Sequence, residues 1–361
     1  MNSYGRFFRV TNFGESHGAS IGVTLDGLPA GVELSEEDIQ RDLELRSPGK
    51  SEISTPRVEA DSVEILSGLF NGRSTGAPIT MIIRNENIDS SGYDKNRDIP
   101  RPGHADYTAW VKYQGYNDFR GGGPFSGRAT AALVMAGAVA KKLLKQMEID
   151  VAASTIQIGD AKITGELSFD EIKANRWSNE VRCAQPETAA RMKELILQAK
   201  SDKDSVGGII ECIIQNVPAG VGEPFFCSVE SEISKLMFSI PGVKGVEFGS
   251  GFKCAEMKGS EHNDPFTITD GKIITETNNA GGILGGITSG MPVVFRVAIK
   301  PTSSIQKEQK SINLKTREAA DLQLEGRFDP CIVPRAVIVV EAAAAIAMAD
   351  LVLSAKSELK T

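Results

Sequence analysis

The segment from Arg101 to Arg128, RPGHADYTAWVKYQGYNDFRGGGPFSGR, combines a histidine, three arginines and a run of three glycines. His104 is one of only three histidines in the chain, and glycines 121–123 leave the backbone open to close approach by a ligand. An Ala-rich segment from Ala129 onward predicts a helix, whose N-terminus would carry about half a positive charge. Together these groups favour an anionic, phosphorylated ligand.

Neither glycine-rich segment fits a common nucleotide-binding motif. No Gly-Lys-Ser/Thr follows residues 121–123 or 281–286 at the spacing of a P-loop, and the second segment, GGILGG, does not open a helix as GxGxxG does. An ATPase or a Rossmann dehydrogenase is therefore disfavoured. The histidines have neither HxH nor HExxH spacing, so no metal site is predicted.

Composition places the chain among single compact proteins of mixed helices and strands. It has 361 residues, 41% of them hydrophobic, and no low-complexity linker divides it. The net charge of −7 argues against a nucleic-acid or membrane-surface partner. Five cysteines without CxxC spacing predict reduced thiols, and the N-terminus lacks an apolar signal region, so a cytoplasmic location is expected. Residues 336–353 are interrupted by Glu341 and Asp350 and predict a buried helix instead of a membrane span.

Hydrophobic periodicity and capping residues predict the elements of secondary structure. Strands are expected at residues 7–13, 21–25, 63–70, 78–83, 151–158, 207–217, 243–248 and 292–299. Helices are expected after Ser35 and Pro186, over 129–147 and 228–238, and from about Arg335 to the C-terminus. A long polar loop is expected over residues 86–100, which lead into Arg101.

Several candidate residues have two interpretations on the sequence alone. His17 lies in Gly-Glu-Ser-His-Gly and is either an exposed histidine on a glycine turn or a ligand-binding group. Arg46 ends a helix before Pro-Gly and is either a solvated residue or a ligand contact. Asp329 is either a buried partner of Arg327 or a catalytic carboxylate. His262 is expected in a surface loop.

Seven fragments in this order resemble the chorismate synthase family over nearly the whole chain. They are FGESHG (13–18), RSPG (46–49), RPGHADY (101–107), RGGG (120–123), NAGGILGG (279–286), KPTSS (300–304) and GRFDP (326–330). The resemblance implies an α+β fold, a β-α-β sandwich in which two antiparallel sheets enclose helices, in a single domain over residues 1–361. One glycine-rich element per half also suggests duplicated halves, about 1–150 and 151–361.

The family's activity implies a lyase that converts 5-enolpyruvylshikimate 3-phosphate to chorismate and phosphate by 1,4-elimination. The resemblance implies reduced FMN as cofactor without net redox change, NADPH as a candidate reductant, and a homotetramer. Implied catalytic residues are His17, His104 and Asp329. Implied cofactor-binding residues are Ser126, Gly285, Lys300, Pro301, Thr302, Ser303, Ser304, Arg327 and, toward NADPH, Arg46. Implied substrate-binding residues are Ser16, Arg46, Arg101, Arg128 and Arg327.

The chain departs from the family pattern at four positions. Pro124 and Phe125 stand where an arginine and a serine are usual, Phe328 replaces a histidine, and Glu52 replaces a further arginine. Loss of one guanidinium contact weakens binding by roughly 1.5–3 kcal/mol. Activity is still expected, because the implied catalytic residues are present. Two alternatives remain at this stage: a flavin- or phosphate-binding paralogue that has lost catalysis, and a non-enzymatic assembly protein.

Overall fold

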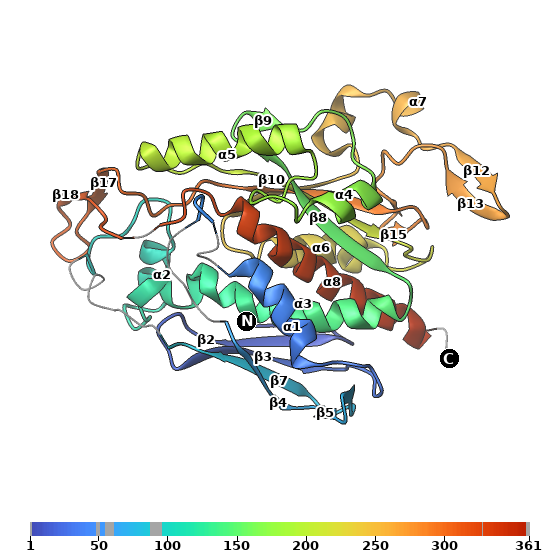
Figure 1. Ribbon diagram of the computed structural model, residues 1–361, viewed down its shortest axis with the longest axis horizontal. Helices are drawn as coiled ribbons and strands as arrows, with labels where there is room; N and C mark the ends of the chain where they lie inside the picture. Colours follow the sequence, from blue (N-terminus) through green and yellow to red (C-terminus); the bar gives the residue numbers. More distant parts are fainter. Residues whose placement is uncertain (1, 48–50, 55–60, 87–95, 327, 359–361) are drawn as a thin grey trace.

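The protein is built from two antiparallel sheets with a layer of helices between them (Figure 1). The structure is a computed structural model, and it describes residues 2–47, 51–54, 61–86, 96–326 and 328–358. All strand pairs in both large sheets are antiparallel over these residues. The α+β sandwich expected from the sequence is therefore confirmed.

Each large sheet has five strands. In spatial order, the first contains β1 (Ser3–Tyr4), β2 (Arg9–Gly14), β3 (Ser20–Asp26), β7 (Ile79–Arg84) and β4 (Val63–Ser67). The second contains β11 (Val243–Phe248), β16 (Val293–Ile299), β10 (Gly208–Gln215), β8 (Asp150–Ile158) and β9 (Ala161–Lys162). In both β2-β3-β7-β4 and β8-β10-β16-β11, the spatial order is the first, second, fourth and third of these strands along the chain. This correspondence supports the duplicated-halves hypothesis, which stays a prediction.

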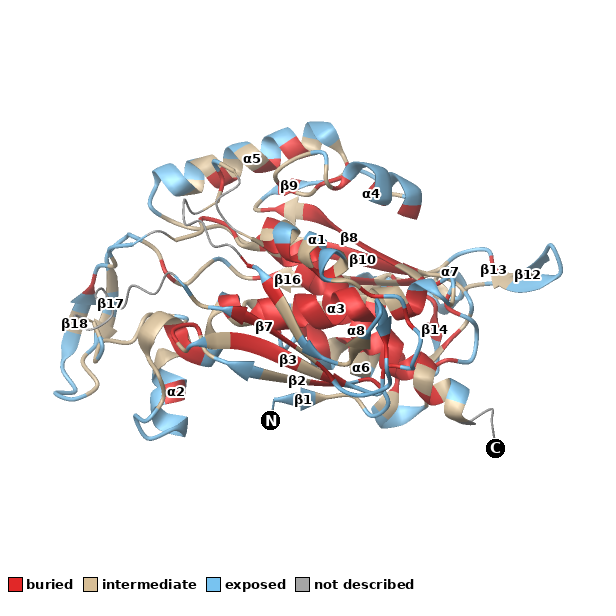
Figure 2. Ribbon diagram, turned by 60° about the horizontal axis from the view of Figure 1, so that its bottom comes forward, coloured by how far each residue is buried: buried red, intermediate tan, exposed pale blue. Residues whose placement is uncertain are grey.

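The helical layer consists of α1 (Glu36–Arg46), α3 (Thr130–Lys145), α6 (Val229–Met237) and α8 (Val333–Glu358). Ser35 caps α1 through a capping box with Asp38, as the sequence predicted. The axes of α3 and α8 approach closely because Gly137 has no side chain, and a Cβ there would collide with Ala342. Figure 2 shows the buried residues concentrated on these two helices.

The C-terminal helix α8 is apolar on all sides because it is surrounded by protein. Its segment Val333–Ser357 is long and apolar enough to cross a membrane, but 94% of the apolar window is buried, as in the core helix of a soluble protein. Its two buried carboxylates have partners. Glu341 pairs with Lys141 at 2.8 Å and with Arg176 at 2.8 Å. Asp350 accepts hydrogen bonds from three successive backbone N–H groups of residues 6–8. The expected buried helix is confirmed.

Smaller elements surround this core. Helices α4 (Phe169–Asn175) and α5 (Pro186–Ser201) pack on the second sheet, α5 with an exposed outer surface (Figure 2). Helix α2 (Asp106–Lys112) lies at one end of the molecule in both views, near the hairpin β17 (Gln309–Ile312) and β18 (Ala319–Leu322). Three further hairpins are β5–β6 (Leu69–Phe70, Arg73–Ser74), β12–β13 (Phe266–Thr269, Lys272–Thr275) and β14–β15 (Ile283–Leu284, Ile287–Thr288). Helix α7 (Gly259–His262) is a single short turn.

Most of the expected elements agree with the structure apart from their ends. The strand expected over 63–70 is divided into β4 and β5, and β5 pairs with β6 instead of joining the large sheet. The loop expected over 86–100 falls largely on residues 87–95, which lie outside the described residues. The helix expected over 129–147 starts at Thr130, after two 3₁₀ turns, Arg120–Phe125 and Gly127–Ala129. Ser126 caps the second turn by accepting a hydrogen bond from the backbone N–H of Arg128. His262 lies at the end of α7 and is partly buried, so it is a helix-terminal residue instead of the predicted loop residue.

Candidate active site

The three consecutive glycines form the turn on which the site is built. Gly121, Gly122 and Gly123 have φ values of 58°, 85° and 52°, a conformation that side chains disfavour. A Cβ at Gly121 would collide with the His17 imidazole and lie 2.8 Å from Ser16 Oγ. His17 is only 6% exposed, so the exposed-turn interpretation of this histidine is wrong. The glycine turn and the turn that carries Ser16 and His17 pack against each other because Gly121 has no side chain.

His104 lies against the next glycine of the same turn. A Cβ at Gly122 would be 3.4 Å from His104 Nε2, so this nitrogen faces the turn. On the other side of the ring, Nδ1 is 2.6 Å from Asp106 Oδ1. An ionised carboxylate only accepts hydrogen bonds, so Nδ1 carries the proton and donates it. Arg101 Nη2 lies 3.1 Å from the same Nδ1, and two donors cannot bond each other there.

Arg101 is clamped by the same carboxylate. Its Nε and Nη2 each donate to Asp106 at 2.8 Å, and its Nη1 donates to Ser304 at 3.1 Å. Burial by itself would raise the pKa of Asp106, but hydrogen bonds from Arg101 and His104 outweigh it and hold that pKa well below its usual range. Asp106 therefore stays ionised and fixes both side chains.

The segment after β16 reaches this end of the site through its lysine and serines. Lys300 Nζ bonds the carbonyl oxygen of Gly103 and lies 2.8 Å from Ser303 Oγ, which also donates to that carbonyl at 2.8 Å. Burial, and to a smaller extent the charge of Lys244, lower the pKa of Lys300. Thr302 Oγ1 is buried with no hydrogen-bond partner among the described residues. This segment and the His104 turn thus form one structural unit.

A buried carboxylate, Asp61, joins two of the predicted substrate-binding arginines. Its Oδ2 accepts from Arg46 Nη2 at 2.6 Å, and its Oδ1 pairs with Arg128 Nη1. Burial by itself would raise the pKa of Asp61, but the charges of Arg46 and Arg128 outweigh it, and the pKa lies below its usual range. Arg46 is 2% exposed, so the interpretation of Arg46 as a solvated residue is wrong.

Asn85 connects Arg128 to the histidine turn. Its Oδ1 accepts from Arg128 Nε at 2.8 Å. Its Nδ2 donates to the carbonyl oxygens of Glu15 at 3.0 Å and Gly18 at 2.8 Å, which bracket Ser16 and His17. The end of β7, where Asn85 lies, therefore sets the position of both the turn and the arginine.

Asp329 is held by an arginine that the sequence did not single out. Arg335 Nη1 pairs with Asp329, and Arg335 Nε donates to the carbonyl oxygen of Arg46 at 3.0 Å. Arg327, the partner considered for Asp329 and a predicted flavin and substrate contact, lies outside the described residues. Because Arg335 bonds both Asp329 and the end of α1, the first turn of α8 connects the carboxylate to the arginine cluster.

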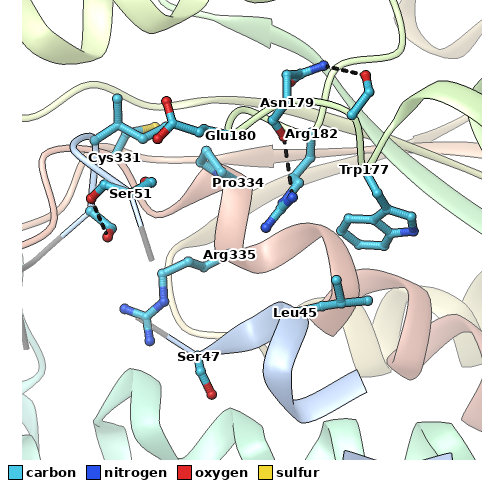
Figure 3. A pocket seen from close by; sticks show the side chains of 13 residues that line it. Leu45, Ser47, Ser51, Trp177, Asn179, Glu180, Arg182, Cys331, Pro334 and Arg335 are labelled. Atoms are coloured by element: carbon cyan, nitrogen blue, oxygen red, sulfur yellow. Dashed lines mark hydrogen bonds between the residues drawn. The ribbon is translucent and has the colours of Figure 1, made fainter. Parts of the chain in front are cut away.

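A pocket of about 280 Å³ lies beside this cluster (Figure 3). Its lining contains none of the predicted site residues. It is lined by Leu45, Ser47, Ser51, Ile53, Ser54, Trp177, Ser178, Asn179, Glu180, Arg182, Cys331, Pro334 and Arg335. Figure 3 shows Arg335 reaching toward Ser47, with Trp177 across the pocket. We place the candidate active site at the glycine turn because the two predicted histidines converge there and neither lines this pocket.

The structure leaves one predicted cofactor residue apart from the others. Gly285 lies in the turn of the β14–β15 hairpin, whose Gly286 carbonyl oxygen accepts from Val229 N–H of α6 at 3.0 Å. This hairpin lies at the opposite end of the molecule from α2 in Figures 1 and 2. Among the described residues, no contact joins Gly285 to the glycine turn. The geometry of this chain therefore does not support a flavin contact for Gly285, which stays a prediction.

The departures from the family pattern have identifiable surroundings. Pro124 is exposed, and the Phe125 ring lies 6.5 Å from the Tyr113 ring. Glu52 pairs with Lys193 of α5. The Phe328 ring packs against Gly326. Within the described ranges, none of these four side chains makes the hydrogen bonds given above for His104, Arg46, Arg101 or Arg128.

The residues that the sequence did not single out for a role are those that hold the predicted ones. Asp61 lies just before the strand expected over 63–70, and Asn85 lies between the strand expected over 78–83 and the loop expected from residue 86, so neither carries a recognisable signal. Asp106 lies inside the RPGHADY fragment, and its spacing of two residues from His104 is a usable sign of a His-Asp pair. Arg335 carries a signal only for the start of the last helix.

Three comparisons with known proteins agree. The sequence pattern of the chorismate synthase family matches residues 8–353. A chorismate synthase from Korarchaeum cryptofilum is 54% identical over 347 residues, 96% of this chain and 96% of that protein. One from Methanosarcina mazei is 50% identical over 349 residues, 97% of this chain and 95% of that protein.

The fold gives the same answer. A crystal structure of chorismate synthase superposes with a TM-score of 0.76 at 32% identity, covering 97% of this chain and 92% of that one. These full-length matches favour an active enzyme over the paralogue without catalysis and over the assembly protein. The chain therefore belongs to the chorismate synthase family and is a lyase of that type.

Proposed function

We propose that this chain converts 5-enolpyruvylshikimate 3-phosphate to chorismate and phosphate at the glycine turn, with reduced FMN as cofactor. Membership of the family implies a small-molecule substrate and a reduced flavin. One observation carries the assignment of the site: His17 and His104 lie against the neighbouring glycines 121 and 122 of a single turn. Since neighbouring Cα atoms are about 3.8 Å apart, adjacent residues of one turn position both imidazoles.

The residues beside His104 fit a flavin and its phosphate. Lys300 and Ser303 place a cationic group and a hydroxyl group beside Gly103, and Ser304 bonds Arg101. The buried Thr302 Oγ1, which has no described protein partner, would gain one from a phosphate oxygen. When bound, reduced FMN supplies the electron density that assists the departure of the substrate's phosphate. Ser126 is proposed as a further contact because it caps the turn before α3.

The chain's own residues have separable tasks in this proposal. Arg46, Arg101 and Arg128 bind the anionic groups of the substrate, and Ser16, on the His17 turn, is a further substrate contact. His17 donates a proton to an oxygen of the leaving phosphate. His104, whose Nδ1–H donates a hydrogen bond to Asp106, presents Nε2 to the flavin. Asp329, oriented by Arg335, assists removal of the ring proton.

Turnover under anaerobic conditions tests the activity. Wild-type protein with FMN reduced chemically should form chorismate from 5-enolpyruvylshikimate 3-phosphate, measured by its absorbance and by phosphate release. His17→Ala should lose at least about 100-fold in kcat while its substrate dissociation constant, measured with oxidised FMN, changes less than tenfold. An inactive wild type that still binds both molecules would support loss of catalysis instead.

Three finer assignments belong to the same proposal. NADPH is proposed as an alternative reductant near Arg46, and turnover with NADPH plus FMN but without dithionite would show an intrinsic reductase. A homotetramer is proposed, and sedimentation would give the mass directly. A cytoplasmic location is proposed because the cysteines in the described residues are unpaired.

A further inference from the structure

Asp61 has no assigned role and makes contacts that only an ionised carboxylate can make. One oxygen accepts from Arg46 Nη2 at 2.6 Å and from Ser47 Oγ at 3.1 Å, and the other pairs with Arg128 Nη1. Its side chain is 0% exposed, so it is inaccessible to a ligand. Any effect of Asp61 on the substrate would therefore act through its arginine partners, of which Arg128, 8% exposed, is more accessible than Arg46, 2% exposed.

Asn85 uses both the oxygen and the nitrogen of its side-chain amide, and neither aspartate nor a hydrophobic residue could make the same bonds. The oxygen accepts from Arg128 Nε, and the nitrogen donates to the carbonyls of Glu15 and Gly18. Aspartate would place a carboxylate against two carbonyl oxygens, and a hydrophobic residue would lose all three bonds. Asn85 thereby sets the distance between the Arg128 guanidinium and the His17 turn.

We infer that Asp61 and Asn85 are positioning residues that hold Arg128 in register with His17. The inference rests on the proposed function, because it gives Arg128 the substrate's anionic groups and His17 the leaving phosphate. Among the described residues, the Asp61 carboxylate pairs with the guanidiniums of both Arg46 and Arg128. Asp61 thus limits the repulsion between the two arginines.

The two residues should affect different kinetic constants. Asp61 fixes both arginines, so Asp61→Asn should raise KM and the substrate dissociation constant and lower kcat/KM by about 100-fold. Asn85 connects arginine and histidine, so Asn85→Ala should lower kcat more than it raises KM, by roughly 10- to 100-fold. A purely structural role would change the melting temperature without this division.

The experiment compares Asp61→Asn and Asn85→Ala with a control, Asp42→Asn. Like Asp61, Asp42 is a buried carboxylate paired with a cation, in this case Lys141 at 2.6 Å. Asp42 lies on α1, outside the proposed site. Steady-state kinetics with reduced FMN, calorimetric binding of 5-enolpyruvylshikimate 3-phosphate with oxidised FMN, and thermal melts are measured for each variant. The control should keep kcat/KM within about threefold of wild type.

A double mutant separates action through Arg128 from action through the turn alone. If Asn85 acts by holding Arg128, the loss caused by Asn85→Ala should shrink at least about tenfold when Arg128→Ala is already present. The inference would be overturned if the loss of kcat/KM in the double variant equalled the product of the losses in the two single variants. It would also be overturned if Asn85→Ala folded and kept kcat/KM within threefold of wild type. If Asp61→Asn does not fold, the Asn85 arms decide.

Failure of the proposed function would give different experimental results from failure of the positioning inference. A wild type that binds substrate but makes no chorismate contradicts the proposed activity and leaves calorimetry as the test of positioning. In that case a substrate dissociation constant that is unchanged in both Asp61→Asn and Asn85→Ala would refute the role of these residues.

Discussion

Replacing Gly121 by alanine should disable the enzyme while leaving it folded. Gly121 is where the glycine turn meets the His17 turn, and its φ of 58° lies in the left-handed region. A methyl group at this position would enter space occupied by the His17 ring and by Ser16. The substitution therefore adds two separate costs, backbone strain and displacement of a proposed proton donor.

The contacts set the size of each cost. The added Cβ would lie 2.8 Å from Ser16 Oγ, 0.6 Å short of the 3.4 Å at which ordinary contact begins, and nearer still to the imidazole. The imidazole must therefore move by about 1 Å, which costs about 100-fold in rate, or about 2.7 kcal/mol of transition-state stabilisation. Strain at positive φ adds about 1 kcal/mol of destabilisation, a fall in melting temperature of about 2 °C or less for a chain of this size.

Two other glycines separate these costs in the assay. Gly165 has a φ of 72° with nothing within 4 Å, so Gly165→Ala carries the strain without the collision. Gly127 lies near the site, has no positive φ and also has open space around it. Anaerobic turnover with reduced FMN should fall about 100-fold for Gly121→Ala and stay within about threefold of wild type for the two controls.

Two results would contradict this reasoning. If Gly121→Ala keeps kcat near wild type with a melting temperature like that of Gly165→Ala, the His17 position does not govern the rate. If all three variants lose activity together, the loss comes from general destabilisation and not from the collision at the turn.

Three further predictions concern buried groups. Hydrogen bonds from Arg101 and His104 outweigh burial and hold the pKa of Asp106 below its usual value near 3.9. The stabilisation by this carboxylate is therefore complete above about pH 4 and is lost as the pH falls through the depressed pKa. In urea melts, the free energies of unfolding of wild type and Asp106→Asn should differ by about 2 kcal/mol from pH 7 to 4, and the difference should shrink below pH 4. Asp350→Ala removes the acceptor of three backbone N–H groups and should lower the free energy of unfolding by roughly 3 kcal/mol with kcat unchanged. Burial raises the pKa of the Cys331 thiol to about 12, so iodoacetamide at pH 8 should label exposed Cys254 and, by peptide mass spectrometry, leave Cys331 unmodified until urea is added.

Much of the fold could be predicted because its core elements carry strong local signals. Strand β16 alternates buried and half-buried residues over Val293–Ile299, as its sequence pattern indicated. The start of α1 followed from Ser35 and the acidic residues after it. The sandwich itself came from resemblance, since neither periodicity nor capping shows which strands pair. The crossing of α3 and α8 at Gly137 depends on a contact between residues about 200 positions apart, which no local pattern contains.

The reactive groups of the candidate site could be named from the sequence, but their partners could not. A histidine can move protons near neutral pH and a glycine allows close approach of the backbone, so both residue types can be recognised from the sequence. Asp61 and Asn85 are common polar residues, and only tertiary structure shows that they bond Arg128. The interpretation of Arg46 as solvated failed for the same reason, since its partner lies 15 residues further along the chain.

The arginines themselves show why these partners matter to function. A guanidinium on a free side chain can adopt many positions, and ordering it would reduce the affinity for an anion. In this structure Asp106 fixes Arg101, and Asp61 fixes Arg46 and Arg128, before any ligand binds. Each carboxylate lowers the net positive charge but removes the entropic cost of ordering. In the proposed reaction, a proton from His17 reaches a leaving oxygen whose position the arginines determine, so the reaction depends on this arrangement. Rate should therefore depend on the carboxylates and on Asn85 as much as on the histidines.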